Sequence, residues 1–383
     1  MKDETKIVTT GRDPKAHAGA VNTPVYHAST IIYPSLAAIR GKEKIPYTYG
    51  RRGTPTTTAL QEAISALEGA DGTMLTPSGA SAVSLAIMSA VEAGSHMLMV
   101  DSVYQPTRKL CDRLMTRLGV ETEYYDPLIG GDIATLIRDN TALIFMESPG
   151  SQTFEIQDVS AIVAAAQKRG VKTAIDNTWA TPLNFRPLDH GVDFSVLAAT
   201  KYVVGHADAL LGTVAARGEN FKHLQNVHGL IGYSVGPDDV FLALRGLRTM
   251  PTRMKQHQHA ALDIAAWLQS LSFVRKIYYP AMPDAPGHDL WQRDFSGAGG
   301  LFSVELEPCS EEQLAAMLDN MRLFGMGYSW GGFESLIVPC EIVRTASSFK
   351  TNGQMLRLNI GLEHIDDLKD DLRDGFARAR YTT

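Results

Sequence analysis

The chain has 383 residues, of which 44% are hydrophobic and 20% charged, and its net charge is -6. This composition is typical of a globular protein, and the length exceeds the roughly 250–300 residues at which a single core stops growing. The acidic balance without a basic tract argues against nucleic acid or an anionic membrane as a partner, and no run approaches the roughly 18 apolar residues of a membrane span.

The amino terminus and the cysteines predict where the protein works. Residues 1–17 are polar and lack the apolar stretch of a secretory signal. The three cysteines, at positions 111, 309 and 340, lie far apart in the sequence. An odd and sparse set argues against a disulfide framework and suits a reducing environment. We therefore expect a cytoplasmic protein.

Residues 1–54 show little periodicity and predict an extended arm. Strands and helices then alternate. A first helix from about residue 55 ends at Gly69, strands are expected at 73–76, 96–101, 119–125, 142–147, 171–176, 194–200 and 209–215, and further helices at 80–92, 106–118, 131–138 and 158–169. This alternation predicts an α/β fold with a mainly parallel sheet that helices cover on both faces. Ligands of such sheets bind at the carboxyl ends of the strands.

The rest of the chain predicts a smaller α+β unit. A helical stretch from about 238 to 270 is expected to be interrupted near Pro251. Strands are expected at 274–279, 300–307 and 354–360, with a charged last helix at 365–379. We predict an amino-terminal arm (1–54), a large domain (55–247) and a carboxyl-terminal domain (248–383).

Two of the expected strands end on residues of complementary chemistry. Lys201 follows the apolar run 193–199, and Asp176 follows the apolar run 171–175. An amine and a carboxylate at neighbouring strand ends suit pyridoxal phosphate (PLP). The lysine would form a Schiff base with its aldehyde, and the aspartate would keep the ring nitrogen protonated. Taken alone, Lys201 is equally well explained as a solvated surface group. The choice between the two interpretations therefore depends on the other candidate residues.

The phosphate of PLP needs hydrogen-bond donors, and two segments offer them. Residues 76–81 run from a strand end into a helix, where Gly79 permits close approach and the helix start offers free N–H groups. Thr200 could add a hydroxyl. Tyr49 and Arg51 lie on a glycine-flanked loop, and a guanidinium binds phosphate oxygens in a forked geometry. Ordinary helix capping and an exposed basic turn are the plainer interpretations of these two segments.

Two further residues could serve a ring and a substrate. Tyr104 follows a strand end and could stack on a pyridine ring, although a core tyrosine is equally well explained. Arg357 lies in an apolar strand, where an arginine needs a partner. It could bind the α-carboxylate of an amino acid or form a structural ion pair. His257 and His259 are two apart in an expected helix and make a poor metal pair, and we expect no metal.

These segments together resemble the Cys/Met-metabolism family of PLP enzymes. The resemblance runs from about residue 45 to the carboxyl terminus, and its most specific part is the run 199–206, Ala-Thr-Lys-Tyr-Val-Val-Gly-His. It implies the fold type I, aminotransferase-like architecture. Within the family, the chain is most similar to the branch that cleaves the Cβ–sulfur bond of cystathionine. Tyr328 and Trp330 stand where the γ-eliminating branches usually carry glutamate and leucine, and residues 147–151 depart from those branches' usual E-T-P-T-N-P.

The resemblance also implies a role for each candidate. Lys201 is the Schiff-base lysine and moves protons, Asp176 pairs with the ring nitrogen, and Tyr104 stacks on the ring near the substrate amine. The phosphate is bound by Gly79, Ala80 and Thr200, together with Tyr49 and Arg51 of a neighbouring subunit. Arg357 binds the substrate carboxylate, with Tyr328, Ser329 and Trp330 beside it.

The implied activity is PLP-dependent β-elimination of L-cystathionine to homocysteine, pyruvate and ammonia, for methionine biosynthesis, in a tetramer of two catalytic dimers. Ala198 departs from many relatives, which have serine there, so one phosphate contact is missing. Alternatives stay open: a cystathionine γ-lyase, γ-synthase or sulfhydrylase, a cystine or cysteine-conjugate β-lyase, or a PLP-binding regulator without turnover.

Overall fold

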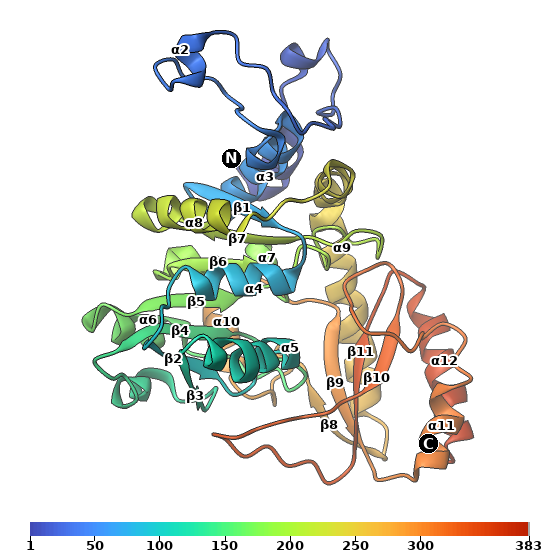
Figure 1. Cartoon of the computed structure of the whole chain (residues 1–383). Coiled ribbons are helices and arrows are strands. Elements are labelled where there is room, and N and C mark those ends of the chain that lie inside the picture. The colour runs from blue at the N-terminus through green and yellow to red at the C-terminus, as the bar shows by residue number, and fades with distance from the viewer. Residues whose placement is uncertain (382–383) are drawn as a thin grey trace.

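The amino-terminal part of the chain forms an arm. The computed structural model describes residues 1–381. Figure 1 shows the segment between α1 and α3 projecting away from the rest of the molecule. The arm carries α1 (Asp3–Thr9), η1 (Pro14–His17), α2 (Leu36–Ile39) and η2 (Gly50–Arg52). Ile32, Leu36 and Ile39 on it are 84%, 63% and 61% exposed, an unusual state for three aliphatic side chains of one segment.

A seven-stranded sheet forms the centre of the large unit. Its strands are β1 (Gly72–Thr76), β2 (His96–Val100), β3 (Glu121–Tyr125), β4 (Thr141–Glu147), β5 (Lys172–Asp176), β6 (Phe194–Leu197) and β7 (Gly212–Ala216), in the order β1-β7-β6-β5-β4-β2-β3. The pairs from β6 to β3 are parallel, and β7 is antiparallel to both of its neighbours. The predicted mainly parallel sheet is therefore confirmed.

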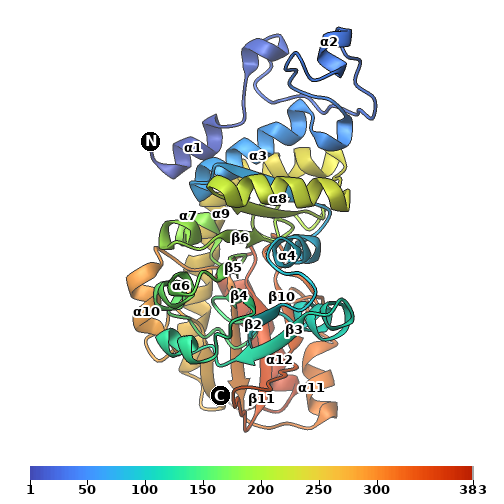
Figure 2. The ribbon, with the colours of Figure 1, turned by 60° about the vertical axis from the view of Figure 1, so that its left-hand side comes forward.

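Helices cover both faces of this sheet. They are α3 (Pro55–Glu68), α4 (Gly79–Met88), α5 (Gln105–Lys109), which continues as the π-helical η3 (Leu110–Met115), η4 (Gly130–Thr135), α6 (Val159–Lys168), α7 (Thr181–Asn184), η5 (Pro187–His190) and α8 (Gly218–Ile231). Figure 2 shows α4 on one side of the strands and α6 and α7 on the other. The helix predicted at 131–138 is wrong. Only Ile133 and Ile137 of that segment are buried apolar residues, too few to stabilise more than the short turn η4.

The carboxyl-terminal unit is an antiparallel sheet with helices, as predicted. Its strands are β8 (Val274–Tyr278), β9 (Leu301–Leu306), β10 (Leu336–Pro339) and β11 (Gln354–Asn359), in the order β10-β11-β9-β8, with helices α10 (His288–Asp294), α11 (Glu311–Leu318) and α12 (Ile365–Arg378). A contiguous cluster of buried apolar side chains extends from Ile144 in β4 to Phe302 in β9. The two sheets thus share one core.

Helix α9 (Pro237–Gln269) runs alongside both units without a break (Figure 1). The interruption predicted near Pro251 is wrong. Leu247, Met250 and Met254 around the proline are all buried, and this packing outweighs the local cost of a proline in a helix. The predicted division at residue 247 falls inside α9 and stays a prediction. Across the described residues, no helix combines the length and the apolar character needed to span a membrane.

The carboxyl group of Glu68, at the end of α3, is expected to make the stability of the fold depend on pH. It is fully buried and accepts a hydrogen bond from the Ser195 hydroxyl at 2.9 Å. Burial raises the pKa of Glu68 to about 8, from 4.5 in an exposed chain. The folded state therefore binds one more proton than the unfolded state between these values, so stability falls as the pH rises through this window.

The variant Glu68→Gln keeps the acceptor for Ser195 but cannot ionise. It should stabilise the protein more at pH 8 than at pH 5.5, by roughly 1.4 kcal/mol for each pH unit within the window. Melting temperatures of both proteins at the two pH values measure this. Glu62→Gln, an exposed position of the same helix, is the control. An equal shift for Glu68→Gln at both pH values would show that Glu68 is not protonated on folding.

Candidate active site

The carboxyl ends of the sheet strands open into a cleft of about 280 Å³. The small unit closes its other side with the loop before β10 and with β11. Ten of the twelve residues singled out from the sequence line it: Gly79, Ala80, Tyr104, Asp176, Thr200, Lys201, Tyr328, Ser329, Trp330 and Arg357. Residues up to 278 positions apart in the chain are thus brought to one place, and their individual roles stay predictions.

Lys201 lies four residues after the end of β6. Its Nζ donates to the Ser329 hydroxyl at 2.6 Å and lies 5.5 Å from the ring centroid of Trp330. Burial and the charge of Arg357 lower the pKa of Lys201 to about 8, and Asp176 opposes this shift. A lysine with such a pKa can release and take up a proton near neutral pH, which general acid–base chemistry requires.

The turn that follows Lys201 is held by a buried arginine. Arg253 in α9 donates through one nitrogen to the carbonyl groups of Tyr202 and Gly246, both at 2.8 Å. Gly205 closes the turn with a φ of 69°, and a Cβ there would lie 2.0 Å from the guanidinium. Arg253 was not among the candidates singled out from the sequence, although an arginine between Met250 and Met254 on a buried helix face was a signal for it.

Asp176 is the last residue of β5, and Thr178 holds its carboxylate. The Thr178 N–H and hydroxyl donate to the same oxygen at 3.0 and 2.5 Å. Burial raises the pKa of Asp176, while Thr178 and Lys201 oppose that shift. The Thr178 hydroxyl also accepts from the Ala198 N–H at 2.8 Å, so it links the ends of β5 and β6. The Asp-Asn-Thr sequence is typical of such a turn and could have predicted this contact.

The start of α4 provides a site for an anion. In residues 1–381 the N–H groups of Gly79 and Ala80 have no acceptor, as expected in the first turn of a helix. A Cβ at Gly79 would lie 2.4 Å from the Cβ of Ala198, so only glycine lets this helix approach the end of β6. The Thr200 hydroxyl accepts from the Leu211 N–H at 2.9 Å and donates to the Leu211 carbonyl at 3.2 Å, so both bonds hold it at the cleft.

Ser329 joins Lys201 to Arg357. Its hydroxyl accepts from Lys201, and its carbonyl accepts from the Arg357 guanidinium at 3.2 Å. Ser329 has a φ of 88°, a left-handed conformation that a serine rarely adopts and that is often found where function requires it. Burial lowers the pKa of Arg357, which no carboxylate within 4.0 Å neutralises among the described residues. The structural ion pair considered for Arg357 is therefore not formed.

Tyr49 and Arg51 do not line this cleft. Tyr49 is 46% exposed. Arg51 donates to the carbonyl of Gly229 at 3.2 Å and lines a separate pocket together with Arg52. Within one subunit, the structure therefore does not bring these two residues to Lys201.

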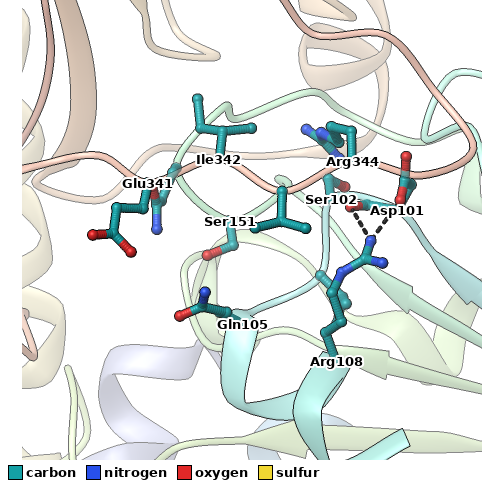
Figure 3. Close-up of a pocket in the computed structure, with 11 residues that line it drawn as sticks. Asp101, Ser102, Gln105, Arg108, Ser151, Glu341, Ile342 and Arg344 are labelled. Atoms are coloured by element: carbon teal, nitrogen blue, oxygen red, sulfur yellow. Dashed lines mark hydrogen bonds and ion pairs between the residues drawn. The ribbon is translucent and has the colours of Figure 1, made fainter. Parts of the chain in front are cut away.

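A segment of the small unit, residues 341–347, crosses the large unit beside the cleft (Figure 3). Asp101 holds it: its carboxylate accepts from the N–H groups of Thr345, Ala346 and Ser347 at 2.7 to 3.1 Å. The Arg108 guanidinium donates to the same carboxylate at 2.5 Å. These bonds, which we call the Asp101 clasp, keep the pKa of Asp101 low, at about 2. Ser151 and Gln152 line both this crossing and the cleft.

The cleft offers what PLP requires. In the described residues, two N–H groups without an acceptor at the start of α4 suit its phosphate. The lowered pKa of Lys201 suits reaction with its aldehyde, and the Asp176 carboxylate, held by Thr178, suits its ring nitrogen. Gly79, Ala80 and Thr200 would hold the phosphate end, and Asp176 the ring end. Ala198 lines the cleft without a hydroxyl, and the missing phosphate contact stays a prediction.

Comparisons with known proteins support the assignment of PLP to this cleft. The family model described as Cys/Met metabolism PLP-dependent enzyme matches residues 4–377. A Rhizobium johnstonii protein that bears the name cystathionine beta-lyase provisionally is 50% identical over 98% of this chain and 96% of its own length. The cystathionine beta-lyase of Escherichia coli is 42% identical over 98% of each chain. A crystal structure of cystathionine gamma synthase from Xanthomonas oryzae is 32% identical, covers 100% of both chains and superposes with a TM-score of 0.91. The chain therefore belongs to the Cys/Met-metabolism family of PLP-dependent enzymes.

Proposed function

We propose that this enzyme cleaves the Cβ–sulfur bond of L-cystathionine, which with one water gives homocysteine, pyruvate and ammonia. The observation that carries the proposal is the wall of the cleft. Tyr328 and Trp330 line it from the small unit, at positions where the family resemblance implies glutamate and leucine in the γ-eliminating branches. The names of the two relatives at 50% and 42% identity support the same activity.

The cleft residues divide the work between binding and proton transfer. When bound, PLP supplies an electron sink that stabilises negative charge on the substrate Cα. Arg357 binds the α-carboxylate and so orients the Cα–H bond toward Lys201. Asp176, held by Thr178, keeps the ring nitrogen protonated. Lys201 Nζ takes the α-proton and returns a proton to the departing sulfur, a dual role that its lowered pKa favours.

The wall restricts the chemistry to Cβ. Loss of sulfur from Cγ needs a second proton removal, at Cβ, and hence a base near that carbon. Tyr328 and Trp330 offer that part of the cleft an aromatic hydroxyl and an indole instead of a carboxylate. Tyr104, 47% exposed, lines the cleft and would cover the cofactor ring.

Product analysis tests this function. Purified enzyme is supplied with L-cystathionine, L-cystine or an activated homoserine ester, and pyruvate, 2-oxobutyrate and thiols are quantified, with alanine racemisation followed in parallel. Pyruvate and homocysteine are expected as the main products, with the highest kcat/KM for cystathionine. Cysteine and 2-oxobutyrate as main products would assign a γ-lyase instead. A higher kcat/KM for cystine would assign a different β-lyase, and no turnover at all would indicate a regulator.

We also propose that the enzyme works in the cytoplasm as a homotetramer made of two catalytic dimers. Two observations support the dimer: Tyr49 and Arg51 lie outside the cleft of their own subunit, and the arm that carries them exposes Ile32, Leu36 and Ile39. A second copy that covered the arm could receive both residues at its phosphate site. The three cysteines form no disulfide, which supports a reducing compartment.

Hybrid dimers test the shared site. A Lys201→Ala subunit and an Arg51→Ala subunit, co-expressed with different tags and purified through both, should form one intact site in each dimer. About half of the wild-type activity per dimer is therefore expected, although each parent alone is impaired. A hybrid no more active than the mean of its parents would show that Arg51 serves its own subunit.

A further inference from the structure

Glu147 is a carboxyl group in the cleft to which the proposed reaction assigns no task. It is the last residue of β4, and it pairs with Asp176, the last residue of the parallel strand β5. Paired residues of neighbouring strands point to the same face of a sheet. Both side chains line the cleft. Two carboxyl groups therefore stand side by side at the base of the site.

The contacts of the two carboxyl groups differ. The Glu147 carboxyl accepts one hydrogen bond, from the N–H of Tyr104 at 2.8 Å. The Asp176 carboxyl accepts two from Thr178 and faces Lys201. Among residues 1–381, no lysine, arginine or histidine lies within 4.0 Å of Glu147, since the nearby Arg344 pairs with Glu155 at 2.9 Å.

These contacts decide which group keeps a proton. Burial, and then the charge of Asp176, raise the pKa of Glu147 well above its usual range, while the Tyr104 N–H and Arg344 oppose the shift only in part. Burial raises the pKa of Asp176 as well, but its two Thr178 bonds and Lys201 oppose that shift and favour its charged form. The Tyr104 hydroxyl, whose pKa is also raised, stays neutral. Because Asp176 has more contacts that stabilise a negative charge, a proton held by the pair lies on Glu147.

We infer that Glu147 is a positioning residue, which as a neutral acid fixes the main chain of Tyr104 beside the bound cofactor and leaves the carboxylate charge to Asp176 alone. This inference rests on the proposed function, since it assumes a cofactor in the cleft. Tyr104 precedes α5 as its N-cap, and its N–H has no other side-chain acceptor among the described residues. Its carbonyl accepts from the N–H groups of Thr107 and Arg108 in α5, so Glu147 supplies the contact that ties this end of the helix to β4.

Two substitutions separate the hydrogen bond from the charge. Glu147→Gln keeps a carbonyl acceptor and cannot ionise, and Glu147→Leu fills similar space without an acceptor. Loss of this hydrogen bond should weaken the site by up to about 10-fold. Three quantities are measured for each variant: the dissociation constant of PLP from the apoenzyme, the visible circular dichroism per bound PLP, and the pH profile of kcat/KM with cystathionine.

For Glu147→Gln we expect a PLP dissociation constant and a dichroic band within about 3-fold of wild type, and a pH profile that superposes on the wild type between about pH 6 and 8.5. For Glu147→Leu we expect about 10-fold weaker PLP binding, a diminished dichroic band and about 10-fold lower kcat/KM. In a Tyr104→Ala background, Glu147→Leu should cause little further loss, because no ring remains to be positioned.

Two results would overturn the inference. If Glu147→Gln is as damaging as Glu147→Leu, the charge is required and Glu147 is not a neutral acid. If Glu147→Leu matches the wild type in all three quantities, Glu147 positions nothing. PLP binding and dichroism need no substrate, so they stand apart from the proposed function. If the enzyme does not turn over cystathionine but the two variants still differ in PLP binding and dichroism, the proposed substrate is wrong and the proposed role of Glu147 stands.

Discussion

Replacing Lys201 with alanine is expected to abolish turnover of cystathionine. Lys201 Nζ is the amine in the cleft whose pKa is lowered to about 8, and within residues 1–381 no other lysine lines the cleft. Loss of a positioned acid–base group alone lowers kcat by roughly 10²- to 10⁴-fold, and loss of the covalent attachment adds to this. The visible absorption band of the native enzyme should vanish in the same variant, which a spectrum measures directly.

The matched control is Lys255→Ala, since Lys255 is a surface lysine whose side chain is 74% exposed. Its activity and spectrum should equal those of the wild type. Addition of a small primary amine should restore part of the activity of Lys201→Ala, because the space of the missing side chain can admit a substitute base. Reduction of the native enzyme with borohydride should leave a pyridoxyl group on the peptide that contains Lys201. A tag on another peptide would contradict the assignment.

Replacing Arg357 with alanine is expected to raise KM for cystathionine by about 10- to 100-fold, the equivalent of one hydrogen bond to a charged group. Arg357 lines the cleft without a carboxylate partner, so its charge is available to a substrate carboxylate. The change in kcat should be smaller than the change in KM, since the α-carboxylate is bound before and during the reaction.

Arg357→Lys tests whether charge alone suffices. It keeps the positive charge but not the planar fork that binds a carboxylate through two bonds, so KM should fall between the wild type and Arg357→Ala. A second consequence concerns Lys201, because the charge of Arg357 lowers the pKa of Lys201. That pKa should rise in Arg357→Ala and remain low in Arg357→Lys. A KM unchanged in both variants would remove Arg357 from the substrate site.

Strand ends explain how much of the site could be predicted from the sequence. Lys201 and Asp176 each follow an apolar run, and parallel strands bring their carboxyl ends to one edge whatever the loops between them do. The candidate phosphate site, which stays a prediction, could be proposed in the same way, because a strand end, a glycine and a helix start are all recognisable in the order of residues. These features are local, and local sequence determines them.

Contacts between distant segments could not be predicted in this way. Ser329 reaches Lys201 across 128 positions, and the Asp101 clasp holds residues 244 to 246 positions away. Glu147 belongs to a segment that the sequence marked only as different from γ-eliminating relatives. Its place beside Asp176 depends on the register of β4 and β5. The helix interruption predicted near Pro251 is the opposite case. There the local effect of a proline was clear in the sequence, but the burial of α9 outweighs it.

The Asp101 clasp and Ser329 bear on when the enzyme matures. The large sheet is complete once β7 has been synthesised, but Ser329, the 345–347 turn and Arg357 emerge from the ribosome long afterwards. Until then, Lys201 lacks its hydroxyl partner and Asp101 faces water without its three amide donors. The wall of the cleft that the small unit contributes can therefore form only after every strand of the large sheet has been synthesised.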